Sequence, residues 1–77
     1  MNLKKEDTQG KWRTALLKEL LDRGVSLPTI DILTLPMENQ PDYKKELVAK
    51  EILLMVVQKS KDETDMLKKL EEHLNKA

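Results

Sequence analysis

The sequence lacks cysteine and phenylalanine, and it has one tryptophan, one tyrosine and one histidine among its 77 residues. Without cysteine there can be no disulfide bond, thiolate zinc site or cysteine-bound iron–sulfur cluster. One histidine and two glycines leave neither an imidazole cluster for a metal nor a glycine-rich loop for a phosphate group. We therefore expect no metal and no cofactor. The absence of disulfides is typical of a reducing compartment, so we expect a cytoplasmic protein.

Long apolar runs and unbalanced charge are also missing. The longest apolar run extends from Ile52 to Val57, which is too short to span a membrane. The 14 basic and 14 acidic residues give a formal net charge of zero, which disfavours long-range attraction to nucleic acid and removes a barrier to self-association. With 39% hydrophobic residues the chain is too apolar for intrinsic disorder, and its length allows one small domain.

The spacing of apolar residues predicts three long helices. Residues 1–11 are polar and without periodicity, so we expect a flexible leader followed by a single domain over residues 12–77. An amphipathic stripe predicts a helix over residues 12–23, which Gly24 would end. A second helix is expected from Pro41 to about residue 58, and its apolar run should place it at the centre of the fold. Ser60 and Glu63 have capping-box spacing and predict a last helix to about residue 75.

The segment between the first two long helices has two interpretations. Ser26 and Pro28 suit the first turn of a short helix, whereas residues 29–35 have the composition of a strand. No second strand is evident, so we favour a helix of one to two turns ended by Pro36, with an intermolecular strand as the alternative. The expected fold is an all-α bundle of three long helices and one short helix, in which the last two helices form an antiparallel hairpin.

Residues 20–30, followed by Leu33, resemble the centre of a helix-turn-helix over about twenty residues. Gly24 would close the first helix, Val25 and Ser26 would begin the second, and Ile30 and Leu33 would pack back on the first. This resemblance implies a DNA-binding regulator that uses residues 16–35. The outward positions, however, would carry no group that reads a base edge: Leu27, Pro28, Asp31 and Ile32.

Basic residues near the start of the chain would have to contact DNA phosphates in that case: Lys4, Lys5, Lys11 and Arg13. A ribbon–helix–helix arrangement built on residues 29–35 would present no basic or amide-rich surface either. DNA binding is therefore the alternative function rather than the preferred one.

Catalysis has little support in the residue inventory. His73 is the one base of the usual kind, and we interpret it as a surface or boundary residue of the last helix. We therefore expect that the protein is not an enzyme and has no small-molecule substrate.

A surplus of apolar residues is the feature that best indicates a function. Such a surplus on the surface usually marks an interface. We predict a non-catalytic protein–protein interaction or oligomerisation module that acts as a small accessory or regulatory protein. Its partner would be another protein or a second copy, against which one face of the helix over residues 41–58 would also be buried. These residues would bind it: Leu27, Ile30, Ile32, Leu33, Leu35 and Met37.

Overall fold

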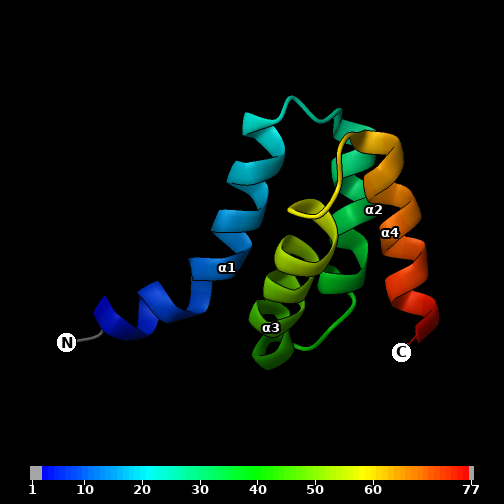
Figure 1. Ribbon diagram of the computed structural model, residues 1–77. Coiled ribbons are helices and arrows are strands. Elements are labelled where there is room, and N and C mark those ends of the chain that lie inside the picture. Colours follow the sequence, from blue (N-terminus) through cyan, green and yellow to red (C-terminus); the bar gives the residue numbers. More distant parts are fainter. Residues whose placement is uncertain (1–2, 77) are drawn as a thin grey trace.

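A computed structural model describes the backbone of residues 3–76 and the side chains of residues 10–76. This part of the chain is all-α, as predicted, and contains no strand. Its elements are α1 (Leu3–Asp22), α2 (Leu27–Glu38), α3 (Asp42–Ile52), a π-helical turn η1 (Leu53–Val57) that continues α3, and α4 (Glu63–Lys76) (Figure 1). No helix within it is both long and apolar enough to cross a membrane.

Helix α1 begins earlier than predicted. It starts at Leu3 rather than near Trp12, so residues 3–11, expected as a flexible leader, belong to the helix. The helix is bent in its first half (Figure 1). At Trp12 the backbone N–H donates to the Glu46 carboxylate, with an N to Oε1 distance of 2.7 Å. A side chain that enters the hydrogen-bond ladder is a recognised cause of a helix bend.

The turn between α1 and α2 has the predicted glycine at the predicted place. Gly24 has a φ of 72°, in the left-handed region that favours glycine. Its N–H donates to the Leu21 carbonyl at 3.0 Å, and the Val25 N–H donates to the Leu20 carbonyl at 3.0 Å. These two bonds form a Schellman motif, which satisfies carbonyls that the end of a helix leaves free. The buried side chain of Val25 then joins the core.

Helix α2 is longer than predicted and excludes the strand interpretation of residues 29–35. Ser26 is its N-cap residue, as the helical interpretation required, but the helix passes through Pro36 and ends at Glu38 after 12 residues. Proline in a helix interior costs about 3 kcal/mol. The continuation buries Met37, which is 2% exposed, and full burial of such a side chain contributes about 1.5–3 kcal/mol. Burial of Met37 therefore offsets much of the cost of Pro36.

The apolar run of residues 52–57 includes the end of α3 and the π-helical turn. The Gln58 N–H donates to the Leu53 carbonyl at 2.9 Å, a bond five residues back along the chain. Ile52, Leu53, Val56 and Val57 are buried, which confirms the predicted central position. One side of this turn meets solvent, because Met55 is 50% exposed.

The last helix begins with a different cap from the predicted one. The Asp65 N–H donates to Asp62 Oδ1 at 2.9 Å, and the Lys61 N–H donates to Asp65 Oδ2 at 3.0 Å. Asp62 and Asp65 therefore fill the roles expected of Ser60 and Glu63. Ser60 is buried, and its hydroxyl donates to the Val56 carbonyl instead. Helix α4 packs against α2 and η1.

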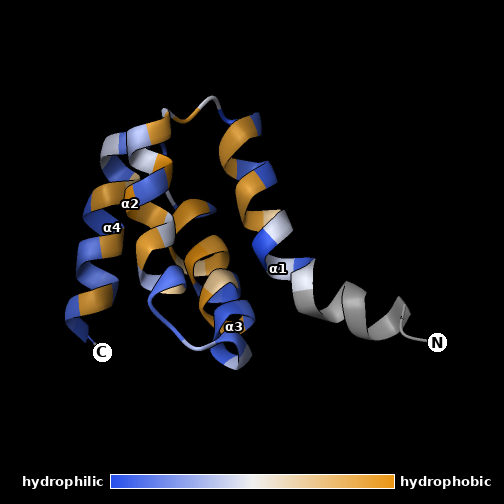
Figure 2. Ribbon diagram, turned by 180° about the vertical axis from the view of Figure 1, so that it is seen from behind, coloured by the Kyte–Doolittle hydropathy of each residue, from blue (hydrophilic) through white to orange (hydrophobic). Residues whose placement is uncertain are grey.

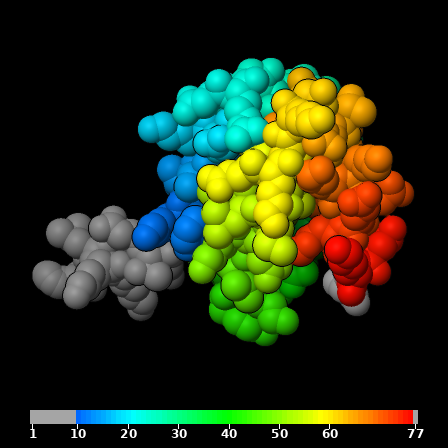
Figure 3. Space-filling model, viewed as in Figure 1, coloured from blue at the N-terminus to red at the C-terminus, as the bar shows by residue number. Residues whose placement is uncertain are grey.

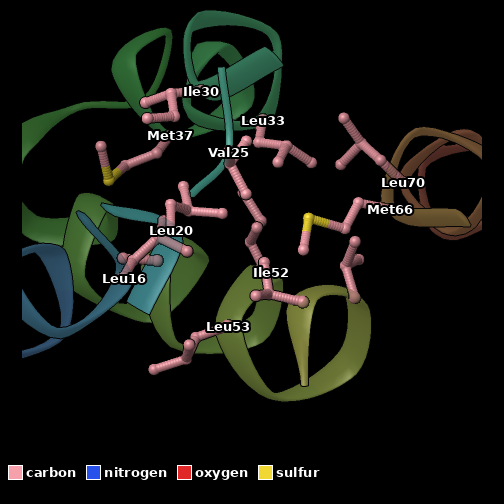
Figure 4. Close-up of a cluster of buried hydrophobic side chains, with 13 residues drawn as sticks. Leu16, Leu20, Val25, Ile30, Leu33, Met37, Ile52, Leu53, Met66 and Leu70 are labelled. Carbon is pink, nitrogen blue, oxygen red and sulfur yellow. The ribbon is translucent and has the colours of Figure 1, made fainter. Parts of the chain in front are cut away.

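All helices contribute to one hydrophobic core, which Figure 4 shows in part. Four partly buried residues pack around this core: Trp12 and Ala15 of α1, Val48 of α3 and Leu54 of η1. The buried members are Leu16, Leu20, Val25, Ile30, Leu33, Met37, Ala49, Ile52, Leu53, Val56, Val57, Met66 and Leu70.

Candidate interaction surfaces

The outward side of α2 is an exposed apolar stripe. Leu27, Ile32 and Leu35 are 70%, 48% and 56% exposed, and Pro28 and Asp31 are exposed between them. Positions 28, 31, 32 and 35 share one side of a helix because they follow the i, i+3, i+4, i+7 pattern. We call these five residues the α2 face. Figure 2 views the molecule from behind relative to Figure 1 and shows hydrophobic residues along α2.

The predicted partner-binding set divides into two groups. Leu27, Ile32 and Leu35 are exposed, as a contact surface requires. The other three residues cannot be surface contacts of the folded chain, because they are 6%, 0% and 2% exposed within the core: Ile30, Leu33 and Met37. Their i, i+3, i+7 spacing places them on the inward side of α2. The sequence-based set was therefore wrong for these three residues.

The helix-turn-helix resemblance correctly predicted which residues of α2 point inward. Ile30 and Leu33 are buried, and the four predicted outward residues are exposed. Residues 24–43 contain no lysine or arginine and three acidic residues, so the outward side of α2 carries no base-reading group. DNA binding through this helix thus gains no support from the composition of its surface.

Two of the four predicted phosphate contacts lie outside the described side chains: Lys4 and Lys5. Arg13 is half-buried, and Lys11 Nζ lies 5.6 Å from the centre of the Trp12 ring. The binding of nucleic acid by these four residues therefore stays a prediction.

A second surface, whose residues the sequence interpretation did not name, lies between α1 and α3. It is a shallow depression lined by Trp12 of α1 and by Tyr43 and Leu47 of α3, and by three charged residues: Lys11, Glu46 and Lys50. Tyr43 is 79% exposed and Leu47 is 56% exposed. Figure 3 shows the described part of α1, blue to cyan, directly against α3. The only two aromatic residues of the chain therefore meet at one place on its surface.

Lysine ammonium groups surround these aromatic rings. The Nζ atoms of Lys11 and Lys50 lie 5.6 Å and 5.4 Å from the centre of the Trp12 ring, and Lys44 Nζ lies 5.9 Å from that of Tyr43. These distances are within the range of cation–π attraction, which contributes about 0.5–1 kcal/mol at exposed sites. We call this surface the aromatic patch: Lys11, Trp12, Tyr43, Lys44, Leu47 and Lys50.

Glu46 lies beneath the aromatic patch and faces inward. Its Oε1 atom accepts the Trp12 N–H, and its buried Oε2 atom has no hydrogen-bond partner among the side chains of residues 10–76 or the backbone of residues 3–76. The lysine groups, in contrast, are on exposed residues. Among the described side chains, the rim of the patch consequently carries three ammonium groups, while the one carboxylate of the lining points into the protein.

A polar cluster joins the start of α2 to α4. The Ser26 N–H and hydroxyl donate to Glu63 at 3.2 Å and 2.9 Å, and Ser26 Oγ lies 3.2 Å from Thr29 Oγ1. The Thr29 hydroxyl, together with the hydroxyl and N–H of Ser26, lowers the pKa of Glu63 below its ordinary value. Helix α2 has no acidic residue in its first turn, so Glu63 supplies the carboxylate that a capping box would have there. We interpret the cluster as structural.

Arg23 forms a second link between distant parts of the chain. Its Nε atom donates to Glu19 at 2.7 Å, and its Nη1 atom donates to the carbonyls of Val57 and Ser60 at 3.1 Å and 3.3 Å. The Val57 carbonyl ends the π-helical turn and also accepts the Ser60 N–H at 3.1 Å, and the Ser60 carbonyl lies just after the turn. Arg23 therefore ties the end of α1 to the end of η1.

His73 lies where the sequence interpretation expected it, at the boundary between surface and interior. Its Nε2 atom is 3.7 Å from Glu51 Oε1, and the imidazole is 29% exposed. Across the described residues, no three carboxylate or imidazole groups converge as the ligands of a metal ion would.

Comparisons of the chain with protein-family models, curated proteins and solved structures found no significant match.

Proposed function

We propose that this chain is a non-catalytic protein–protein interaction module, and that the α2 face contacts its partner protein. The single observation that carries the proposal is the exposure of three large aliphatic side chains on one side of α2: Leu27, Ile32 and Leu35. Contiguous exposed apolar groups of this kind usually mark an interaction site. As such a module, the chain would act in an accessory or regulatory role.

The way in which α2 is held supports this proposal. Glu63 binds the N-terminal end of the helix, and Leu33 and Met37 anchor its inward side in the core. A surface that is rigid before binding loses less conformational entropy when a partner docks. The α2 face therefore has the preorganisation that favours association.

Site-specific photo-crosslinking tests the proposal. A benzophenone amino acid at Leu35 should give a covalent protein adduct in cells that naturally express the chain. The matched control carries the same group at Lys68, an exposed residue of α4 that is not part of the α2 face. An adduct at position 35 but not at position 68 supports the proposal, whether the captured protein is a second copy or another protein. Equal adducts at both positions, or no protein adduct at position 35, would overturn it.

A further inference from the structure

The α2 face and the aromatic patch point away from each other. Helices α2 and α3 pack together, and their buried residues lie on the sides that meet. The α2 face is on the outward side of α2, and Tyr43, Leu47 and Lys50 are on the outward side of α3. Two exposed apolar surfaces thus occupy opposite sides of one small domain.

The two surfaces also differ in charge. Asp31 is the one charged residue of the α2 face, and residues 24–43 contain no basic group. The aromatic patch has three lysines around its rings, and the carboxylate of Glu46 turns inward beneath them. An apolar surface with a negative charge and an apolar surface with a positive rim are complementary.

We propose that the aromatic patch binds the α2 face of a second copy, so that copies of the chain associate head to tail. This inference rests on the proposed function and specifies its partner. A contact between two identical α2 faces would instead bring two Asp31 carboxylates together without a basic residue of α2 to pair with them. Because the contact joins two different surfaces, a pair of copies still has one free surface of each kind, so assembly continues past the dimer as an open chain or a closed ring.

The contact involves few residues on each side, so a weak association is expected. We therefore propose analytical ultracentrifugation of the purified full chain from micromolar to millimolar concentration. The weight-average mass should rise with concentration from 8.9 kDa past the mass of a dimer. It should fall at high salt, which screens exposed charges.

Two variants, each with one damaged surface, provide the decisive experiment. Ile32→Asp damages the α2 face and leaves the aromatic patch intact, whereas Leu47→Asp damages the patch and leaves the α2 face intact. Each variant alone should remain monomeric. A mixture of the two should form a one-to-one dimer, with a mass about twofold higher than that of either variant, because one intact surface of each kind remains. Leu74→Asp is the matched control, because Leu74 is similarly exposed, at 47%, on α4 and should leave chain growth unchanged.

Circular dichroism of each variant establishes that it is folded before its mass is interpreted. A wild-type mass that stays monomeric would overturn the inference. So would a mass that stops at a dimer and is insensitive to Leu47→Asp, because that result indicates pairing of identical α2 faces. A crosslink from position 35 to a different protein, without self-association, would refute head-to-tail assembly and leave the proposed function standing. The absence of any crosslink would refute the proposed function itself.

Discussion

The neighbouring residues Leu33 and Ile32 should respond very differently to truncation, and this difference tests the orientation of α2. Leu33 is 0% exposed and lies in the core, whereas Ile32 is 48% exposed. Truncation of a fully buried leucine to alanine costs about 2–5 kcal/mol, which includes the cavity that it leaves. Ile32→Ala removes about half of a burial contribution of about 1.5–3 kcal/mol, so it should cost about 1 kcal/mol. Leu33→Ala should therefore be less stable than Ile32→Ala by about 2 kcal/mol.

The expected difference is large for a domain of this size. A stability of 0.05–0.15 kcal/mol per residue corresponds to roughly 4–12 kcal/mol for the whole chain. A loss of 1 kcal/mol in stability lowers the midpoint of thermal unfolding by about 4–8 °C in a domain of this size. The midpoint of Leu33→Ala should therefore lie about 8–16 °C below that of Ile32→Ala.

Urea and thermal unfolding, followed by circular dichroism at low micromolar concentration, measure the difference without a contribution from self-association. The dependence of the unfolding free energy on urea should be the same for both variants, because both unfold the same domain. Both substitutions place alanine in α2, and leucine and isoleucine differ in helix propensity by less than about 0.7 kcal/mol, which is well below the expected difference. Equal unfolding midpoints would refute the assignment of Leu33 to the core and of Ile32 to the α2 face.

Three further predictions concern the connections between helices. Arg23→Lys should lower the unfolding free energy by about 1 kcal/mol, because lysine lacks the planar fork that binds Glu19 through one nitrogen and the Val57 and Ser60 carbonyls through another. Urea unfolding measures this loss, and an unchanged midpoint would contradict the link. Gly24→Ala should cost about 1 kcal/mol, since alanine is strained at a φ of 72°; a more stable variant in the same assay would argue against the left-handed turn. The pKa of Glu63 is lowered in the folded chain, so the ionised carboxylate stabilises the folded state at neutral pH. This contribution to the free energy of unfolding is lost as the pH falls through and below the carboxyl range. Glu63→Gln should therefore be less stable than wild type at pH 7 and similar to it near pH 2, and a difference that persists in acid would contradict this account.

The turn after α1 could be predicted from the sequence because local chemistry decides it. Gly24 is the one residue type that enters the left-handed region without cost, and it directly follows an amphipathic stripe. The inward positions of α2 followed from the same local pattern through the helix-turn-helix resemblance. The end of α2 could not be predicted in this way, because Pro36 locally favours termination. Burial of Met37 in tertiary contacts outweighs that local preference.

The cap of α4 shows how several local solutions can compete. Ser60 and Glu63 have the spacing of a capping box, and so do Asp62 and Asp65. The structure uses the second pair, which leaves Glu63 to bind Ser26. No local pattern distinguishes the two pairs, because the choice depends on the position of α2 in space.

The aromatic patch was beyond sequence reasoning for the same reason. Trp12 fits the amphipathic stripe of α1, and Tyr43 and Leu47 occur four residues apart on α3, so neither helix alone indicates a shared surface. The packing of α1 against α3, with Glu46 bonded to the Trp12 backbone, brings them together. A sequence signal did exist, since a chain with two aromatic residues has few ways to build an aromatic surface. It became informative only once the pairing of the helices was known.

Helix α2 carries core residues on its inward side and the residues of the proposed interface on its outward side. Its inward residues are buried in the core, whereas the outward residues Leu27, Ile32 and Leu35 are 70%, 48% and 56% exposed and should contribute less to the stability of the fold. A polar side chain at Ile32 should therefore remove association while the folded state persists, whereas one at Leu33 should remove both. This separation of effects makes the proposed interaction testable in purified protein. A surface assembled only from residues that also stabilise the core would not allow it.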